Sequence, residues 1–425
     1  MINIVRLIGG LVFMGLAVMT LVAAPARPLW IAGLAATEWG YWIAIAALLP
    51  LIPTRGQSRL GKTGAALSLG AIALLLMPVI RANEMNRELP AAFDAAFGPS
   101  RRERAAESED ARLAPLVPAD LFRPVQSRAI RFEERVFGTY EGRKLTLDVY
   151  HPGYVHGPLP TVIVVHGGMW QSGDNAEFVA LNAYLAARDH VVVAINYRLA
   201  PRWRFPAARD DVLSALAYLK VYGHEFGADP ARIAILGRSS GGELALLAAY
   251  TANEPGIRGV ISAYGASDLR YEYEHPAPPR VLDTRGVLET YLGGPPSKAD
   301  DAYFAASPIN FVTSSSPPTL LIHGALDSVI RPEETARLDA RLRDAGVKHI
   351  YLRLPWATHR CDRSFGGPCG QAITYAIERF LDAVMMPAAG PEAGKRKTED
   401  GKAPAAAGER ERARRRRAGV GPREH

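Results

Sequence analysis

The chain has 425 residues, 48% of them hydrophobic and 22% charged, and carries a formal net charge of +7. This length fits one large α/β domain with additional segments. The positive charge does not indicate nucleic-acid binding, because residues 391–425 contain eleven Lys or Arg against six Asp or Glu. We therefore expect residues 388–425 to form a disordered basic tail, and we expect no nucleic-acid partner.

The N-terminal part contains three apolar stretches, each close to the roughly 18 to 20 residues that cross a bilayer as a helix. They are 7–24, 30–52 and 63–80, and only the second contains a charged residue, Glu38. We expect residues 1–81 to form a membrane region with about three transmembrane helices. Two alternatives stay open, since the first stretch could be a cleaved signal peptide and all three could be core helices of a soluble protein.

Charge in the short loops favours a cytoplasmic N-terminus, because the densest basic segment lies between residues 54 and 62. Three spans would then place the long C-terminal part outside the cytoplasm, in a multi-pass membrane protein. Cys361 and Cys369 are the only cysteines, and they could form a disulfide in that oxidising compartment or remain two free thiols. The polar residues 82–125 are expected to form a spacer helix or linker.

The next segments predict β-strands. Residues 131–150 alternate between apolar and polar side chains, which indicates a hairpin. A β-branched run at 161–165 predicts a buried strand and ends in His-Gly-Gly-Met-Trp at 166–170. A further buried strand at 190–196 leads into Tyr-Arg-Leu-Ala-Pro at 197–201.

Residues 232–250 change from a buried strand to a helix within five residues, and a serine lies at the turn. Gly237, Ser239 and Gly241 fit the pattern GxSxG, in which the glycines allow a turn tight enough to strain the serine backbone. The amides after the serine begin a helix, where unpaired N–H groups and the helix dipole favour negative charge. The stretch therefore indicates a nucleophilic serine.

Two later strands each end in a polar turn. Residues 318–322 lead into His-Gly-Ala-Leu-Asp at 323–327, and residues 350–354 are followed by His359. The segment 267–310 has little periodicity and contains several aromatic residues. We expect it to form a cap insertion over the serine, although an ordinary surface excursion is the alternative.

The motifs HGGxW, YRLAP, GxSxG and HGxxD, followed by a histidine near the C-terminus, resemble those of the α/β-hydrolases. Within that superfamily they are similar to the group of hormone-sensitive-lipase-like esterases and kynurenine formamidases. The resemblance covers roughly residues 131–385 and implies an α/β-hydrolase domain at 126–387, with a mostly parallel central sheet flanked by helices. Met169 departs from the HGGG of many lipase-like members, and the motif fits the HGGxW form of kynurenine formamidases and of some feruloyl-type esterases equally well. The resemblance therefore leaves the substrate class open.

The resemblance implies a catalytic triad of Ser239, Asp327 and His359, in the chain order that this fold requires. We expect a serine hydrolase that cleaves carboxylic esters, of carboxylesterase or lipase type, through an acyl-enzyme intermediate. An arylformamidase that uses the same triad is one alternative. A catalytically silent binding protein on a hydrolase fold is the other.

The resemblance also implies an oxyanion hole made by the backbone amides of Gly167, Gly168 and Ser240. Trp170 and Tyr264 are expected to line the substrate pocket. We expect neither a metal nor an organic cofactor, because no metal-ligand or nucleotide-binding motif occurs in the sequence. The expected partners are a small-molecule ester and the lipid bilayer, and the sequence does not indicate an oligomeric state.

Overall fold

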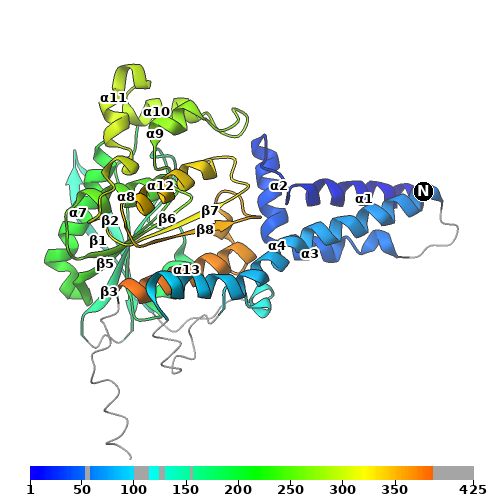
Figure 1. Cartoon of the computed structure of the whole chain (residues 1–425), viewed down its shortest axis with the longest axis horizontal. Coiled ribbons are helices and arrows are strands. Elements are labelled where there is room, and N and C mark those ends of the chain that lie inside the picture. Colours follow the sequence, from blue (N-terminus) through cyan, green and yellow to red (C-terminus); the bar gives the residue numbers. More distant parts are fainter. Residues whose placement is uncertain (53–57, 100–113, 124–129, 154–156, 386–425) are drawn as a thin grey trace, which may run out of the picture. The chain divides into compact units, whose positions relative to one another are not determined.

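The computed structural model describes residues 1–52, 58–99, 114–123, 130–153 and 157–385 (Figure 1). The tail expected at 388–425 and most of the linker expected beyond Pro99 lie outside these ranges. Within them, Met1–Met385 form one unit by their contacts, which includes both the N-terminal helices and the predicted hydrolase domain.

One sheet contains the eight strands found in the described residues. The strands are β1 (Ile130–Tyr140), β2 (Arg143–Pro152), β3 (Leu159–Val165), β4 (Val191–Ile195), β5 (Ala228–Arg238), β6 (Ile257–Ala263), β7 (Thr319–Gly324) and β8 (His349–Leu354). Their order is β1-β2-β4-β3-β5-β6-β7-β8, and all pairs from β4 to β8 are parallel. The predicted hairpin is present as β1 and β2, and β2 also pairs antiparallel with β4.

Helices cover both faces of the sheet (Figure 1). On one face, α6 (Val179–Ala186), α13 (Pro368–Met385) and the second half of α4 (Arg59–Phe97) share a core with Val162 and Val164 of β3. On the other face, α7 (Ala207–Tyr222), α8 (Ser240–Thr251) and α12 (Pro332–Asp344) share a core with Ile163 and Val165. Successive side chains of a strand point to opposite faces, so a strand buried on both faces needs an unbroken apolar run.

The segment between β6 and β7, expected to be a cap, forms short helices at one end of the sheet (Figure 1). These are α9 (Leu269–Glu274), α10 (Thr284–Leu292) and α11 (Pro296–Ala305). Asp268 accepts a hydrogen bond from the Tyr271 amide at 3.0 Å, and Asp283 accepts one from the Gly286 amide at 3.1 Å, so each carboxylate caps a helix start. Helices this short leave little periodicity in the sequence.

The N-terminal helices pack closely on each other. They are α1 (Ile2–Val18), α2 (Arg27–Glu38), α3 (Gly40–Ala46) and the first half of α4, with a 3₁₀ turn at η1 (Leu49–Leu51). A side chain at Gly10 of α1 would collide with the Gly64 backbone of α4, and one at Gly40 would collide with the Leu75 backbone. Small residues at such contacts let helix backbones approach closely, as they do in membrane proteins. The other 3₁₀ helices are η2 (Pro118–Leu121), η3 (Gly223–Phe226), η4 (Pro308–Phe311) and η5 (Cys361–Arg363).

Among the described residues, α4 is the one unbroken helix that is long and apolar enough to cross a membrane, with a mean hydropathy of 2.1 over its most apolar window. Helix α1 is apolar but has only 17 residues. The second predicted stretch, 30–52, is not a single helix, because the chain bends by 85° between α2 and the segment that follows. It would count as a span only as a broken one.

Glu38, the last residue of α2, lies at the bend. Glu38 is fully buried and its Oε2 accepts a hydrogen bond from the Cys369 amide at 3.2 Å. A buried carboxyl group is costly unless it finds such a donor, so this contact fixes the end of α2 against the hydrolase domain. This contact could not be predicted from the apolar sequence of 30–52, because Cys369 lies 331 residues after Glu38.

Residues 82–97 continue α4 and pack on the hydrolase domain, where we expected a spacer helix or linker to begin. Leu89 and Phe93 are buried in the core that also contains Phe380. Arg379 of α13 forms an ion pair with Asp94 at 2.6 Å. The second half of α4 is therefore a core element of the hydrolase domain and not a free spacer.

Replacing Phe93 with alanine tests this packing. Removing a fully buried aromatic side chain leaves a cavity, so we expect Phe93→Ala to lower the free energy of unfolding by about 3–5 kcal/mol. Chemical unfolding in detergent measures the change, with the exposed Glu88→Ala on the same helix as the control, expected within about 0.5 kcal/mol of wild type. A Phe93→Ala protein as stable as the control would show that this half of α4 is not part of the core.

Candidate active site

Ser239 lies at the turn between β5 and α8, in a backbone conformation that is rare for residues other than glycine. Its φ is 53° and its ψ is −126°. Side chains at Gly237 or Gly241 would collide with neighbouring backbone, at Gly237 with Gly241 and at Gly241 with Val165. Both glycines are therefore needed for the turn, which leaves the Ser239 side chain at the carboxyl edge of the sheet.

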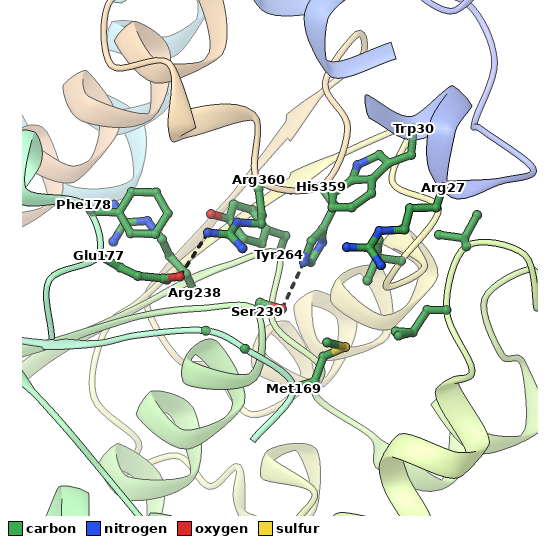
Figure 2. A pocket seen from close by; sticks show the side chains of 15 residues that line it. Arg27, Trp30, Met169, Glu177, Phe178, Arg238, Ser239, Tyr264, His359 and Arg360 are labelled. Carbon is green, nitrogen blue, oxygen red and sulfur yellow. Dashed lines mark hydrogen bonds and ion pairs between the residues drawn. The ribbon is translucent and has the colours of Figure 1, made fainter. Parts of the chain in front are cut away.

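The structure brings the three predicted triad residues together. Asp327 follows β7 and His359 follows β8, so both reach the sheet edge where Ser239 lies. His359 Nε2 lies 3.0 Å from Ser239 Oγ, and His359 Nδ1 lies 2.7 Å from Asp327 Oδ2. Figure 2 shows the His359 ring directed at Ser239. All three side chains are buried, and Ser239 keeps 8% of its surface exposed.

Asp327 is held as an ionised acceptor. Its Oδ1 accepts hydrogen bonds from the amides of Val329 at 2.8 Å and Ile330 at 3.1 Å. Burial alone would raise the pKa of Asp327, but His359 and His323 beside it lower the pKa below its ordinary value. His323 is itself fully buried and contacts Thr335, so it packs at the end of β7.

The backbone amides expected to form an oxyanion hole border the serine. In the described part of the chain, the N–H groups of Gly167, Gly168 and Ser240 donate to no other residue. A side chain at Gly167 would press against the Ser239 Cβ, and at Gly168, which has a φ of +120°, it would collide with the Ser172 backbone, so this loop requires glycine at residue 168 and favours it at residue 167. His166 stacks on Tyr197 with ring centroids 4.1 Å apart, which fixes the start of the loop.

The two predicted pocket residues line two different cavities, and Ser239 lines both. Tyr264 lines the pocket above the serine, with its ring edge-on to His359 at 4.7 Å between centroids. Trp170 stacks on Tyr291 at 4.4 Å and donates its indole N–H to Glu243 at 2.8 Å. It borders a small apolar recess of about 30 Å³ behind Ser239, which cap residues also line.

The pocket above Ser239 has a volume of about 190 Å³ and is shown in Figure 2. The cap insertion contributes Val281 and Leu282 to its wall. Two further wall residues, Arg27 and Trp30, come from α2. The sequence analysis missed these two, because it placed both in the expected membrane region at residues 1–81.

The sequence analysis also did not predict two ion pairs in the pocket wall. Arg238, next to the serine, pairs with Asp362 at 2.6 Å, and the hydroxyl of Tyr264 donates to the other Asp362 oxygen at 2.5 Å. Arg360 pairs with Glu177 at 3.0 Å. The position of Asp362 three residues after His359 was the available signal, since side chains of that loop must lie near the site.

Cys361 and Cys369 form a disulfide in the structure. It closes the loop that follows His359 and leads into α13, the loop against which Glu38 is buried. No group of three or more His, Cys, Asp or Glu side chains in the described ranges is placed to hold a metal ion.

Comparisons with known proteins find relatives that are esterases. Residues 147–342 match the BD-FAE family. The chain is 30% identical to Esterase LipQ of Mycobacterium tuberculosis over 381 residues, which is 84% of each protein. It is 35% identical to Esterase LipC of the same organism over 246 residues, 53% of this chain and 59% of LipC.

Solved structures show the same fold. A hyperthermophilic esterase from the archaeon Pyrobaculum calidifontis is 27% identical, with a TM-score of 0.52 over 60% of this chain and 87% of that chain. EstE1, a carboxylesterase cloned from a metagenomic library, aligns with a TM-score of 0.55 over 72% of this chain and 98% of its own, at 21% identity. The chain belongs to the hormone-sensitive-lipase-like group of carboxylic ester hydrolases in the α/β-hydrolase superfamily.

Proposed function

We propose that the protein hydrolyses carboxylic esters through a covalent acyl-enzyme on Ser239. The observation that carries the proposal is the unbroken chain of contacts from Ser239 through His359 to Asp327, at 3.0 and 2.7 Å. A serine hydroxyl is a poor nucleophile at neutral pH, so it needs a base within hydrogen-bond reach and a group that orients the base. The chain supplies both at one sheet edge.

In the proposed reaction, Ser239 Oγ attacks the ester carbonyl while His359 Nε2 takes the hydroxyl proton. Asp327 accepts the hydrogen bond from His359 Nδ1–H, selects that tautomer and stabilises the imidazolium. His359 then gives the proton to the leaving alcohol. Water, activated by the same histidine, adds to the acyl-enzyme and releases the acid and the free Ser239 hydroxyl.

The amides of Gly167, Gly168 and Ser240 are the proposed donors to the oxyanion that forms on the carbonyl oxygen. They have no other partner in the described residues, so they can serve the transition state without breaking an existing bond. Ser240 also begins α8, where the helix dipole favours negative charge. A single donor of this kind contributes roughly 3 kcal/mol in comparable sites.

The N-terminal arm, defined as α1, α3, η1 and the first half of α4, is proposed to insert into a bilayer. Its exposed surface carries large apolar side chains, among them Ile4, Ile8, Leu11, Leu48 and Leu69. Contacts near both ends of α1 show how it runs relative to α3 and α4. Arg6 of α1 donates to the Pro50 carbonyl at 2.7 Å, and Thr20, just after α1, contacts the Leu74 carbonyl of α4 at 3.4 Å.

Helices α1 and α4 therefore run in the same direction, and the α3 segment returns between them. This arrangement supports a three-pass topology in which the N-terminus lies on one side and the hydrolase domain on the other. Helix α2 then lies along the membrane surface. The disulfide of Cys361 and Cys369 supports an extracytoplasmic hydrolase domain, because such bonds persist in oxidising compartments.

The choice between ester and formamide substrates is tested by kinetics. The triad would also cleave a formamide, but the named relatives are esterases. We expect kcat/KM for short-chain 4-nitrophenyl esters to exceed that for N-formylkynurenine. Faster turnover of the formamide at equal concentration would favour an arylformamidase and contradict this proposal.

The role of Asp327 is tested by Asp327→Asn, which keeps the shape of the side chain but favours the wrong histidine tautomer. By analogy with serine proteases, we expect kcat to fall by about four orders of magnitude. The matched control is Asp268→Asn, because Asp268 also follows a strand but caps α9 and pairs with Arg337. A large loss in the control, with activity retained in Asp327→Asn, would assign the acid to Asp268.

Topology is tested with reporter fusions. A reporter fused after Asp120 should report an extracytoplasmic position, and one fused after Ser58 should report a cytoplasmic position, because α4 crosses the bilayer between them. Reporters that lie on the same side of the membrane at both positions would show that α4 does not cross it. A cytoplasmic signal after Asp120 would reverse the proposed orientation.

A further inference from the structure

Helix α2 is fixed to the hydrolase domain at both ends. At its start, the Arg27 amide donates to the carbonyl of Arg280 in the cap insertion at 2.9 Å. At its end, Glu38 is buried against the Cys369 amide. The residues between these two points are therefore held across the mouth of the catalytic pocket by specific contacts.

Two α2 side chains occupy that mouth. The Trp30 ring lies 6.4 Å from the His359 ring between centroids, and Trp30 is half-buried. Figure 2 shows the Arg27 guanidinium pointing from α2 into the space beside His359. Both side chains line the pocket together with Ser239, so they can contact a group carried by an ester bound there.

The charges in the pocket wall do not cancel. Arg238 is neutralised by Asp362 and Arg360 by Glu177. In the described residues, the Arg27 side chain has neither a hydrogen-bond nor an ion-pair partner. One positive charge at the pocket mouth is thus left without a carboxylate.

We propose that Arg27 and Trp30 form a specificity subsite for an anionic group, a carboxylate or a phosphate, carried by the ester substrate. A guanidinium presents a planar fork of donors that matches both groups, and the exposed Arg27 side chain leaves that fork free to bind one. The inference rests on the proposed ester hydrolysis and names its substrate class. The anionic group can belong to a soluble ester or to a lipid headgroup, because α2 lies next to the arm proposed to enter the bilayer.

The soluble case is tested with mono-4-nitrophenyl glutarate and 4-nitrophenyl valerate, which share acyl length and leaving group but differ by one terminal carboxylate. The readout is the ratio of their kcat/KM values in full-length protein in detergent. We expect Arg27→Ala to lower this anionic-to-neutral ratio about tenfold. Arg27→Lys should retain part of the preference, since it keeps the charge but loses the fork.

The matched control is Arg258→Ala, an exposed arginine near the start of β6, at the opposite edge of the sheet from Ser239. This variant should keep the wild-type ratio. The lipid case uses vesicles of phosphatidylglycerol or phosphatidylcholine, with fatty-acid release as the readout and the same variants. A preference for the anionic lipid that is lost in Arg27→Ala, without an effect on the glutarate ratio, assigns the subsite to a lipid headgroup.

An Arg27→Ala ratio equal to that of wild type in both assays would overturn the subsite. Hydrolysis of the neutral ester in that same experiment would leave the proposed ester hydrolysis intact, so the two failures are distinguishable. A wild-type protein that cleaves none of the esters would overturn the proposed function and the subsite together.

Discussion

The structure depends on the turn that holds Ser239 with a positive φ. That conformation requires the backbone of Gly241 to lie against β3, a distance too short for any side chain. Once the turn is formed, the serine hydroxyl lies at the carboxyl edge of the sheet and α8 begins directly behind it. The loops after β3, β7 and β8 then need only to end at the same edge to complete the site.

This constraint explains why much of the hydrolase domain could be predicted from sequence. In a parallel sheet, the residues that follow successive strands meet at one edge, so short motifs after apolar runs locate a site without knowledge of distances. The resemblance to the α/β-hydrolases implied Asp327 and His359, both of which follow such runs, and in the structure both lie beside Ser239. Local sequence also identified the β1–β2 hairpin and the glycines that precede Trp170.

The N-terminal part was harder to predict, because hydropathy records composition and not contacts. The stretch 30–52 has the length of a span, yet Glu38 binds a backbone amide 331 residues away and the helix bends there. Likewise, residues after Ala82 are mostly polar, yet one face of α4, which includes Leu89 and Phe93, is buried. Both features depend on partners near the C-terminus, which no local window contains.

The same long-range packing links the N-terminal helices to the catalytic pocket. Helix α2 supplies part of the wall above Ser239, so changes in the N-terminal segment can alter substrate choice without touching the triad. This arrangement differs from a hydrolase domain joined to an anchor by a free linker.

The central claim is that Ser239 is a nucleophile activated by His359. Labelling of the folded protein with a fluorophosphonate, followed by mass spectrometry of the peptides, tests it most directly. The account predicts one adduct, on the peptide that contains Ser239, and its loss when the protein is unfolded before labelling. No adduct in folded protein, or an adduct on a different serine, would contradict it.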